Sequence, residues 1–147
     1  MSEQAIKLNT VTREVLASGR LAHLATINPD GTPQVTCIYI GWDGDELVAG
    51  HFANHVKLRN IRRDPRVTLS MESDVTFSGQ VKGFSPYIVV KGLARVEEGG
   101  ALEVLRHNSR GTFPPEGGNY PEGFVTRITP RSVSVLGLGG WQSDCYR

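Results

Sequence analysis

The sequence predicts a mainly β protein, an antiparallel barrel that is closed or nearly closed. Three observations predict it. About seven short runs are rich in β-branched and aromatic residues, as strands are. Turn-forming Gly, Pro, Asn and Asp residues separate these runs, and only a few short segments have the spacing of a helix. Many short strands joined by tight turns are typical of barrels.

The first third of the chain reads as a short helix followed by a β-meander. Thr10 or Thr12 could cap the helix, which carries Val11, Val15 and Leu16 and ends at Ser18-Gly19. Three strands follow, and hairpin turns at 28–31 (Asn-Pro-Asp-Gly) and 43–45 (Asp-Gly-Asp) separate them. We expect these strands at 21–27, 34–42 and 46–50, each pairing with the one before it.

The rest of the chain alternates two helices with strands. Asn54 could cap a helix that begins near His55, and Pro65 ends it, because the residue before a proline is pushed away from α geometry. The remaining elements are predicted as strands at 67–72 and 87–96, a helix at 101–107, and strands at 124–129 and 132–136 on either side of Pro130-Arg131. Loops are expected at 73–85 and 109–123.

Composition limits the classes of function. The 147 residues are expected to form one domain, 1–147, with 39% hydrophobic and 21% charged residues. A net charge of +1 argues against a general nucleic-acid or membrane-surface binder. The first residues lack the pattern of a signal peptide, no apolar run is long enough for a membrane helix, and the two cysteines form no disulfide framework. We therefore expect a cytoplasmic protein.

Positive charge is concentrated in the segment 52–67. Five cations lie there with a single acid, and they are Lys57, Arg59, Arg62, Arg63 and Arg66. Lys57 and Asn60 are one helical turn apart, close enough to act on one ligand group. A phosphate beside them would gain from the free N–H groups and the dipole of the helix start. From these residues alone, a solvated basic helix face is an equal alternative.

Four stretches of the chain resemble the pyridoxamine-phosphate-oxidase-like split-barrel family, and most closely its branch that uses the deazaflavin F420. They are 18–36 (SGRLAHLATINPDGTPQVT), 41–48 (GWDGDELV), 56–68 (VKLRNIRRDPRVT) and 89–96 (VVKGLARV), and the closing 128–133 (ITPRSV) also fits. The resemblance implies a six- to seven-stranded antiparallel split barrel. It also implies a homodimer with the cofactor at the subunit interface and a small-molecule substrate.

The resemblance further implies which residues hold the cofactor. Lys57 would be the phosphate ligand with Asn60 beside it, and Arg59 could add a bidentate contact. Other residues would line the cofactor: Gln34, Thr36 and Cys37 on the second strand, Gly50 and His51 at the end of the third, and His55 and Val56 at the helix start. Tyr87 could give a hydroxyl to the substrate or face the core. Trp141 could stack over the partner's cofactor or remain an unpacked tail residue.

The expected function is therefore an F420-dependent oxidoreductase, with FMN as the alternative cofactor and a non-catalytic cofactor-binding protein as a further alternative. The tail does not reproduce the basic motif with which the vitamin oxidase recognises its substrate, so that reaction is not expected. No proton donor stands out among His51, Tyr87 and ordered water. His51 and His55 have a metal-like spacing but no neighbouring carboxylate, so no metal site is expected. Cys37 has no evident activating base, and a buried thiol is expected.

Overall fold

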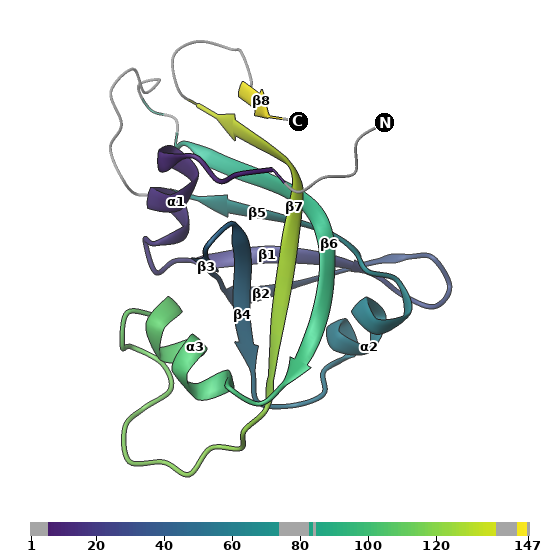
Figure 1. The fold of residues 1–147 in the computed structure, drawn as a ribbon, viewed down its shortest axis with the longest axis vertical. Coiled ribbons are helices and arrows are strands. Elements are labelled where there is room, and N and C mark those ends of the chain that lie inside the picture. Colours follow the sequence, from purple (N-terminus) through teal and green to yellow (C-terminus); the bar gives the residue numbers. More distant parts are fainter. Residues whose placement is uncertain (1–5, 74–82, 84, 138–143, 147) are drawn as a thin grey trace.

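The computed structural model describes residues 6–73, 83, 85–137 and 144–146, and these form a curled antiparallel sheet with three short helices around it (Figure 1). The helices are α1 (Thr10–Leu16), α2 (Val56–Arg63) and α3 (Ala101–Asn108). The strands are β1 (Leu21–Ile27), β2 (Pro33–Tyr39), β3 (Gly41–Asp43), β4 (Glu46–His51), β5 (Arg66–Glu72), β6 (Tyr87–Glu98), β7 (Phe124–Leu136) and β8 (Asp144–Tyr146). The predicted fold class, a mainly β antiparallel split barrel, is confirmed.

The strand order corrects the predicted meander. The strands lie in the order β2-β1-β5-β6-β7-β4-β3, so β2 and β3 occupy opposite ends of the path. The predicted strand 34–42 is in fact two strands that separate at Ile40, whose side chain is fully buried. The chain turns there at Gly41, where an added Cβ would lie 2.1 Å from Asn108 Oδ1. As a result β4 pairs with β3 and β7 instead of pairing with β2.

The two predicted strands at 124–129 and 132–136 are one continuous strand, β7. Pro130 does not break it, because the residue lies at a β-bulge, where a proline is tolerated. Lys91 of β6 pairs with Ser132, whereas the next residue, Gly92, pairs with Pro130, which leaves Arg131 as the extra residue of the bulge. In Figure 1, β6 and β7 run side by side along the length of the molecule, with α2 and α3 on opposite sides of them.

Gly92 is required by the close approach of β7 at this bulge. A Cβ on Gly92 would lie 2.4 Å from the carbonyl oxygen of Thr129, so the backbone itself would have to move. We expect Gly92→Ala to lower the free energy of unfolding by about 1–3 kcal/mol, the usual cost of overpacking. Urea denaturation measures it. At Gly31 an added Cβ would have no atom within 4 Å. Gly31→Ala should therefore lower the free energy of unfolding by only about 1 kcal/mol, because of its left-handed φ.

The core lies inside the curled sheet and is closed at one side by α1. Alternate residues of β1 face inward, with Ala22 and Leu24 fully buried, and Val15 and Leu16 of α1 pack against the same cluster. The cap of α1 is Asn9, whose side chain accepts a hydrogen bond from the Thr12 N–H at 2.8 Å. Neither Thr10 nor Thr12 is the cap. Thr12 is fully buried inside the helix.

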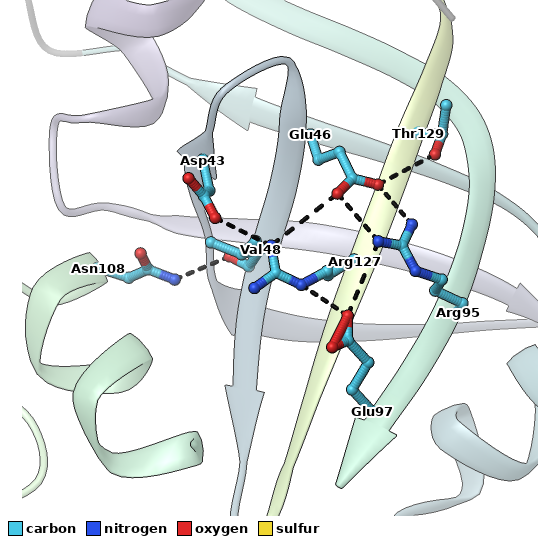
Figure 2. A network of polar contacts seen from close by, with 8 residues as sticks. All are labelled: Asp43, Glu46, Val48, Arg95, Glu97, Asn108, Arg127 and Thr129. Atoms are coloured by element: carbon cyan, nitrogen blue, oxygen red, sulfur yellow. Dashed lines mark hydrogen bonds and ion pairs between the residues drawn. The ribbon is translucent and has the colours of Figure 1, made fainter. Parts of the chain in front are cut away.

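A polar network lies across β3, β4, β6 and β7 (Figure 2). Glu46 is at its centre: Arg95 donates to it at 3.0 Å and Arg127 lies 3.9 Å away. Arg127 also contacts Glu97 at 2.7 Å and Asp43 at 3.1 Å. These alternating charges tie the short β3–β4 hairpin to the two long strands.

The hydrogen bond from Arg95 is the main reason that the pKa of Glu46 lies below its usual value of 4.5. The stabilisation is therefore present above pH 4.5 and is lost as the pH falls through the folded-state pKa. We expect Glu46→Gln to cost less than about 1 kcal/mol at pH 7, as partly exposed ion pairs do, and the difference from wild type to disappear at the acid end. Thermal melts between pH 3 and 7 measure this, with exposed Glu116→Gln as the control.

Candidate functional site

A cleft of about 410 Å³ lies between the start of α2, the end of β2 and the end of β4. It brings together five of the residues that the sequence placed at a cofactor: Cys37, Gly50, His51, His55 and Lys57. Its other lining residues are mostly apolar or aromatic: Leu21, Ile38, Tyr39, Phe52, Ala53, Leu105 and Phe113. No Asp or Glu lines this cleft among the residues that the structure describes.

Lys57 provides the positive charge of this cleft. It lies in the first turn of α2, and its Nζ donates to Thr36 Oγ1 of β2 at 3.3 Å. Burial lowers the pKa of Lys57, because the half-buried ammonium loses part of its hydration. A cation that has lost water and has no carboxylate beside it is arranged to receive an anion from outside.

The start of α2 differs from the prediction in its cap. The N-cap is His55, which makes no side-chain capping bond, whereas Asn54 accepts a hydrogen bond from Arg62 at 2.6 Å. No side chain therefore occupies the helix start, and its free N–H groups remain available to an anionic group. Leu58 and Ile61 are buried on one face, as their spacing predicted.

His51 is a buried, neutral histidine at the wall of the cleft. Its Nε2 lies 2.9 Å from Thr126 Oγ1, and its ring centroid is 6.5 Å from that of His55. Burial, and to a lesser degree Lys57 and His55, lowers the pKa of His51 to about 3. The imidazole is therefore uncharged near neutral pH: it keeps one ring N–H for hydrogen bonding but lacks the second, acidic proton of an imidazolium ion.

Aromatic residues from a distant loop close one side of the cleft. Phe113 stacks on Tyr39 with ring centroids 5.9 Å apart, and it lies 6.5 Å from Phe52. Phe52 in turn stacks on Tyr120 at 5.0 Å. The sequence predicted only a loop at 109–123 and missed this role, because the contacts join residues more than sixty positions apart and no local pattern encodes them.

Asn60 and Gln34 point into the protein rather than into the cleft. Asn60 is 1% exposed, and its Nδ2 lies 3.0 Å from both Thr26 Oγ1 and Asn28 Oδ1. Gln34 Oε1 is 3.4 Å from the same nitrogen. The side-chain oxygen of Asn60, Oδ1, accepts hydrogen bonds from the Arg63 guanidinium. These amides join α2 to β1 and β2, so they hold the helix in place beneath Lys57.

Gly50 and Cys37 lie in the cleft for reasons that the sequence did not show. An added Cβ on Gly50 would lie 2.6 Å from the carbonyl oxygen of Ala101, so the glycine allows α3 to pack closely on β4. Cys37 is exposed, which corrects the expected buried thiol. The reason is that β2 is at the edge of the sheet and no described element covers this side of it.

The other predicted residues lie outside this cleft. Val56 and Arg59 are on the exposed surface of α2, and Val56 is 40% exposed. Tyr87 is the first residue of β6 and pairs with Glu72 of β5. Two strands, β1 and β5, lie between β6 and β2, the strand that borders the cleft. Trp141 lies outside the described residues.

Comparison with known proteins identifies the family. The sequence profile of the pyridoxamine 5'-phosphate oxidase family matches residues 8–117, about three quarters of the chain. The chain belongs to this family. Its members bind flavins or deazaflavins and include oxidoreductases. Comparison with curated protein sequences gave no match.

Solved structures support the same fold. A structure titled "F420 Reductase" is 27% identical, with a TM-score of 0.65, and the match covers 83% of this chain and 94% of that one. A conserved hypothetical protein from Mycobacterium tuberculosis is 21% identical over 96% and 94% of the two chains, with a TM-score of 0.65. A heme binding protein from Mycobacterium smegmatis is 18% identical, with a TM-score of 0.66, and covers 96% of this chain and 59% of its own. The last two similarities concern the fold alone.

Two further features of the described part of the chain bear on function. None of its helices has the length and apolar character needed to cross a bilayer. Its His, Cys, Asp and Glu side chains form no group of three that could hold a metal ion.

Proposed function

We propose that this protein is an F420-dependent oxidoreductase that transfers a hydride between the reduced deazaflavin and a small organic acceptor. The observation that carries the proposal is Lys57, a half-buried ammonium at an uncapped helix start in a cleft without carboxylates. This is the arrangement that a cofactor phosphate requires. The similarity to an F420 reductase at 27% identity supports the choice of cofactor.

The residues of the cleft fit a planar cofactor bound through its phosphate. The Lys57 side chain and the N–H groups of Val56 and Lys57, which donate to no described backbone carbonyl, would hold the phosphate, while Thr36 orients the lysine. The aromatic wall of Tyr39, Phe52 and Phe113 and the uncharged His51 would face a ring system and exclude water from it. A bound deazaflavin would supply the hydride chemistry, and the protein would supply binding and orientation.

The remaining predicted residues have supporting places in this proposal. Arg59 lies on the exposed surface of α2, where it would attract the acidic tail of F420, a group that FMN lacks. Asn60 and Gln34 would fix the helix beneath the phosphate. Tyr87 and Trp141 would act from the second subunit, because the resemblance places the cofactor between subunits.

We propose that the protein is a homodimer that completes this site. Two large apolar side chains are exposed on β2 and β1, the strands that contribute to this wall of the cleft: Val35 of the edge strand β2 is 59% exposed, and Leu21 of β1 is 46% exposed. Exposed apolar residues that adjoin a binding cleft are typical of an interface. Light scattering on the purified protein should give twice the 16.1 kDa chain mass. A monomer at micromolar concentration would contradict the dimer.

Side-by-side titrations with F420 and FMN test the cofactor. We expect saturable binding of F420, followed by the change in its fluorescence, and weaker binding of FMN. Tight FMN binding without measurable F420 binding would overturn the proposal in favour of the flavin alternative. Reduced F420 should then reduce members of a panel of enones and quinones. Binding without reduction of any acceptor would favour a carrier that performs no reaction of its own.

A further inference from the structure

A second cleft, of about 390 Å³, lies on the outer face of β1, β5 and β6, beyond the C-terminal end of α2. Ala25, Thr68 and Lys91 are successive partners across these three strands and form its floor. The complete lining consists of Ala25, Thr26, Ile27, Pro33, Arg66, Val67, Thr68, Lys91, Gly92 and Arg131. It shares no lining residue with the Lys57 cleft.

The β-bulge in β7 brings Arg131 to this cleft. Since Lys91 pairs with Ser132 and Gly92 with Pro130, Arg131 is left out of the ladder. A bulge of this kind redirects a side chain and is often found beside functional sites. The Arg131 Nε is buried and has no hydrogen-bond partner among the residues that the structure describes. A ligand cannot reach this buried N–H directly, but the two Nη groups of Arg131 are not buried and have no hydrogen-bond partner among the described residues, so an anion in the cleft could bind them.

The charges around Arg131 favour the same kind of ligand. Lys91 is exposed and forms no ion pair with the described residues. Arg66 is held by Asp64, with Nε and Nη2 donating at 3.0 and 2.7 Å, so its charge is already compensated. No Asp or Glu belongs to the lining that the structure describes. Lys91 and Arg131 are therefore two cations on the neighbouring strands β6 and β7 that no described carboxylate compensates.

The opposite side of the cleft is apolar. Ala25, Ile27 and Pro33 contribute hydrocarbon surface above the almost fully buried Val67, and Thr68 adds a partly exposed polar side chain. An inorganic anion would use only the cations and would leave this surface exposed to water. An anion attached to an apolar body would use both, because burial of its body adds a hydrophobic contribution to the charge-assisted hydrogen bonds.

We propose that this cleft is a second binding site, separate from the cofactor site, for a small organic anion. The phosphate or carboxylate head would contact Arg131 and Lys91, and the apolar body would lie against Ala25, Ile27 and Pro33. The site goes beyond the proposed oxidoreductase function and does not depend on it.

NMR titration of the full chain with phenyl phosphate and with benzoate tests the proposal. Either ligand should shift the amide signals of Thr68 and Gly92 in a saturable way, and the tighter of the two identifies the preferred head group. Inorganic phosphate, which lacks the body, and benzyl alcohol, which lacks the charge, should each bind more weakly. Lys91→Gln and Arg131→Gln should each weaken the tighter ligand about tenfold, the usual effect of losing a charge-assisted hydrogen bond.

Matched variants separate this site from general attraction of anions. Lys7→Gln removes an exposed charge elsewhere and should leave the affinity unchanged. Lys57→Ala should also leave the affinity measured at Thr68 and Gly92 unchanged, whether or not Lys57 binds the cofactor. Equal losses in Lys7→Gln and Lys91→Gln would overturn the proposal, as would the absence of shifts at Thr68 and Gly92. It would also be overturned if the shifts appeared only at the start of α2 and disappeared in Lys57→Ala. Lys91 is exposed, so its variant keeps the test valid if Arg131→Gln fails to fold.

Discussion

Lys57→Ala is expected to weaken F420 binding by roughly 10- to 150-fold while the protein remains folded. A hydrogen bond between two charged groups contributes about 1.5–3 kcal/mol, and each 1.4 kcal/mol is a factor of ten in affinity. The ammonium makes one hydrogen bond inside the protein, to Thr36 at 3.3 Å, and burial opposes its charge. Its removal should therefore leave the free energy of unfolding almost unchanged. Fluorescence titration and urea denaturation of the same sample measure the two quantities.

The arginines of α2 provide the controls for this experiment. Arg63 donates to the carbonyl of Ile27 and to Asn60, so Arg63→Ala should lower stability more than affinity. Arg59 is exposed, and Arg59→Ala should weaken F420 by a few-fold at low salt and hardly at all at high salt. If all three variants lost affinity equally, the segment would be a diffuse charge patch and Lys57 would not be a phosphate ligand.

Prediction from the sequence was accurate where short-range patterns decide the structure. The strand 21–27 has its predicted bounds, and the helix predicted at 101–107 extends by only one residue, to Asn108. Both depend on the spacing of apolar residues and on adjacent turn residues. Ile40 and Pro130 show where this information ends. Ile40 leaves its strand to enter the core, and Pro130 stays within β7 because a bulge in β7, at Arg131, accommodates it. Both outcomes depend on distant strands.

The same distinction applies to the candidate site. Lys57, His51 and His55 come from one continuous segment, and the structure places them around one cleft. Phe113 and Tyr120 join them through a loop whose local sequence carries no signal of aromatic packing. Cys37 was misjudged because the covering of β2 depends on the order of strands in the sheet, which the sequence does not contain.

Asn60→Ala is expected to lower the free energy of unfolding by about 2–4 kcal/mol. The amide nitrogen lies 3.0 Å from Thr26 and from Asn28, and Thr26 is itself 1% exposed. The substitution removes a hydrogen-bond partner from the buried Thr26 and the partly buried Asn28 and also removes volume beneath α2, and each effect costs on the order of 1–3 kcal/mol. Chemical denaturation measures the loss. Asn54→Ala, the same change at an exposed position on the same segment, should cost less than about 0.5 kcal/mol.

The Asn60 variant also separates two roles that the sequence could not distinguish. If Asn60 contacted the cofactor phosphate itself, Asn60→Ala would weaken F420 binding about tenfold while changing stability little. In the structure its nitrogen is occupied by Thr26 and Asn28, and its carbonyl accepts from Arg63. We therefore expect Asn60→Ala to cause a large loss of stability and only a small loss of F420 affinity. The loss of affinity should be smaller than that of Lys57→Ala and should shrink further as the temperature is lowered. Unchanged stability together with lost affinity would show that this amide turns toward the ligand. In that case α2 would be held in place without Asn60, by its buried Leu58 and Ile61 and by the hydrogen bond from Arg63 to Ile27.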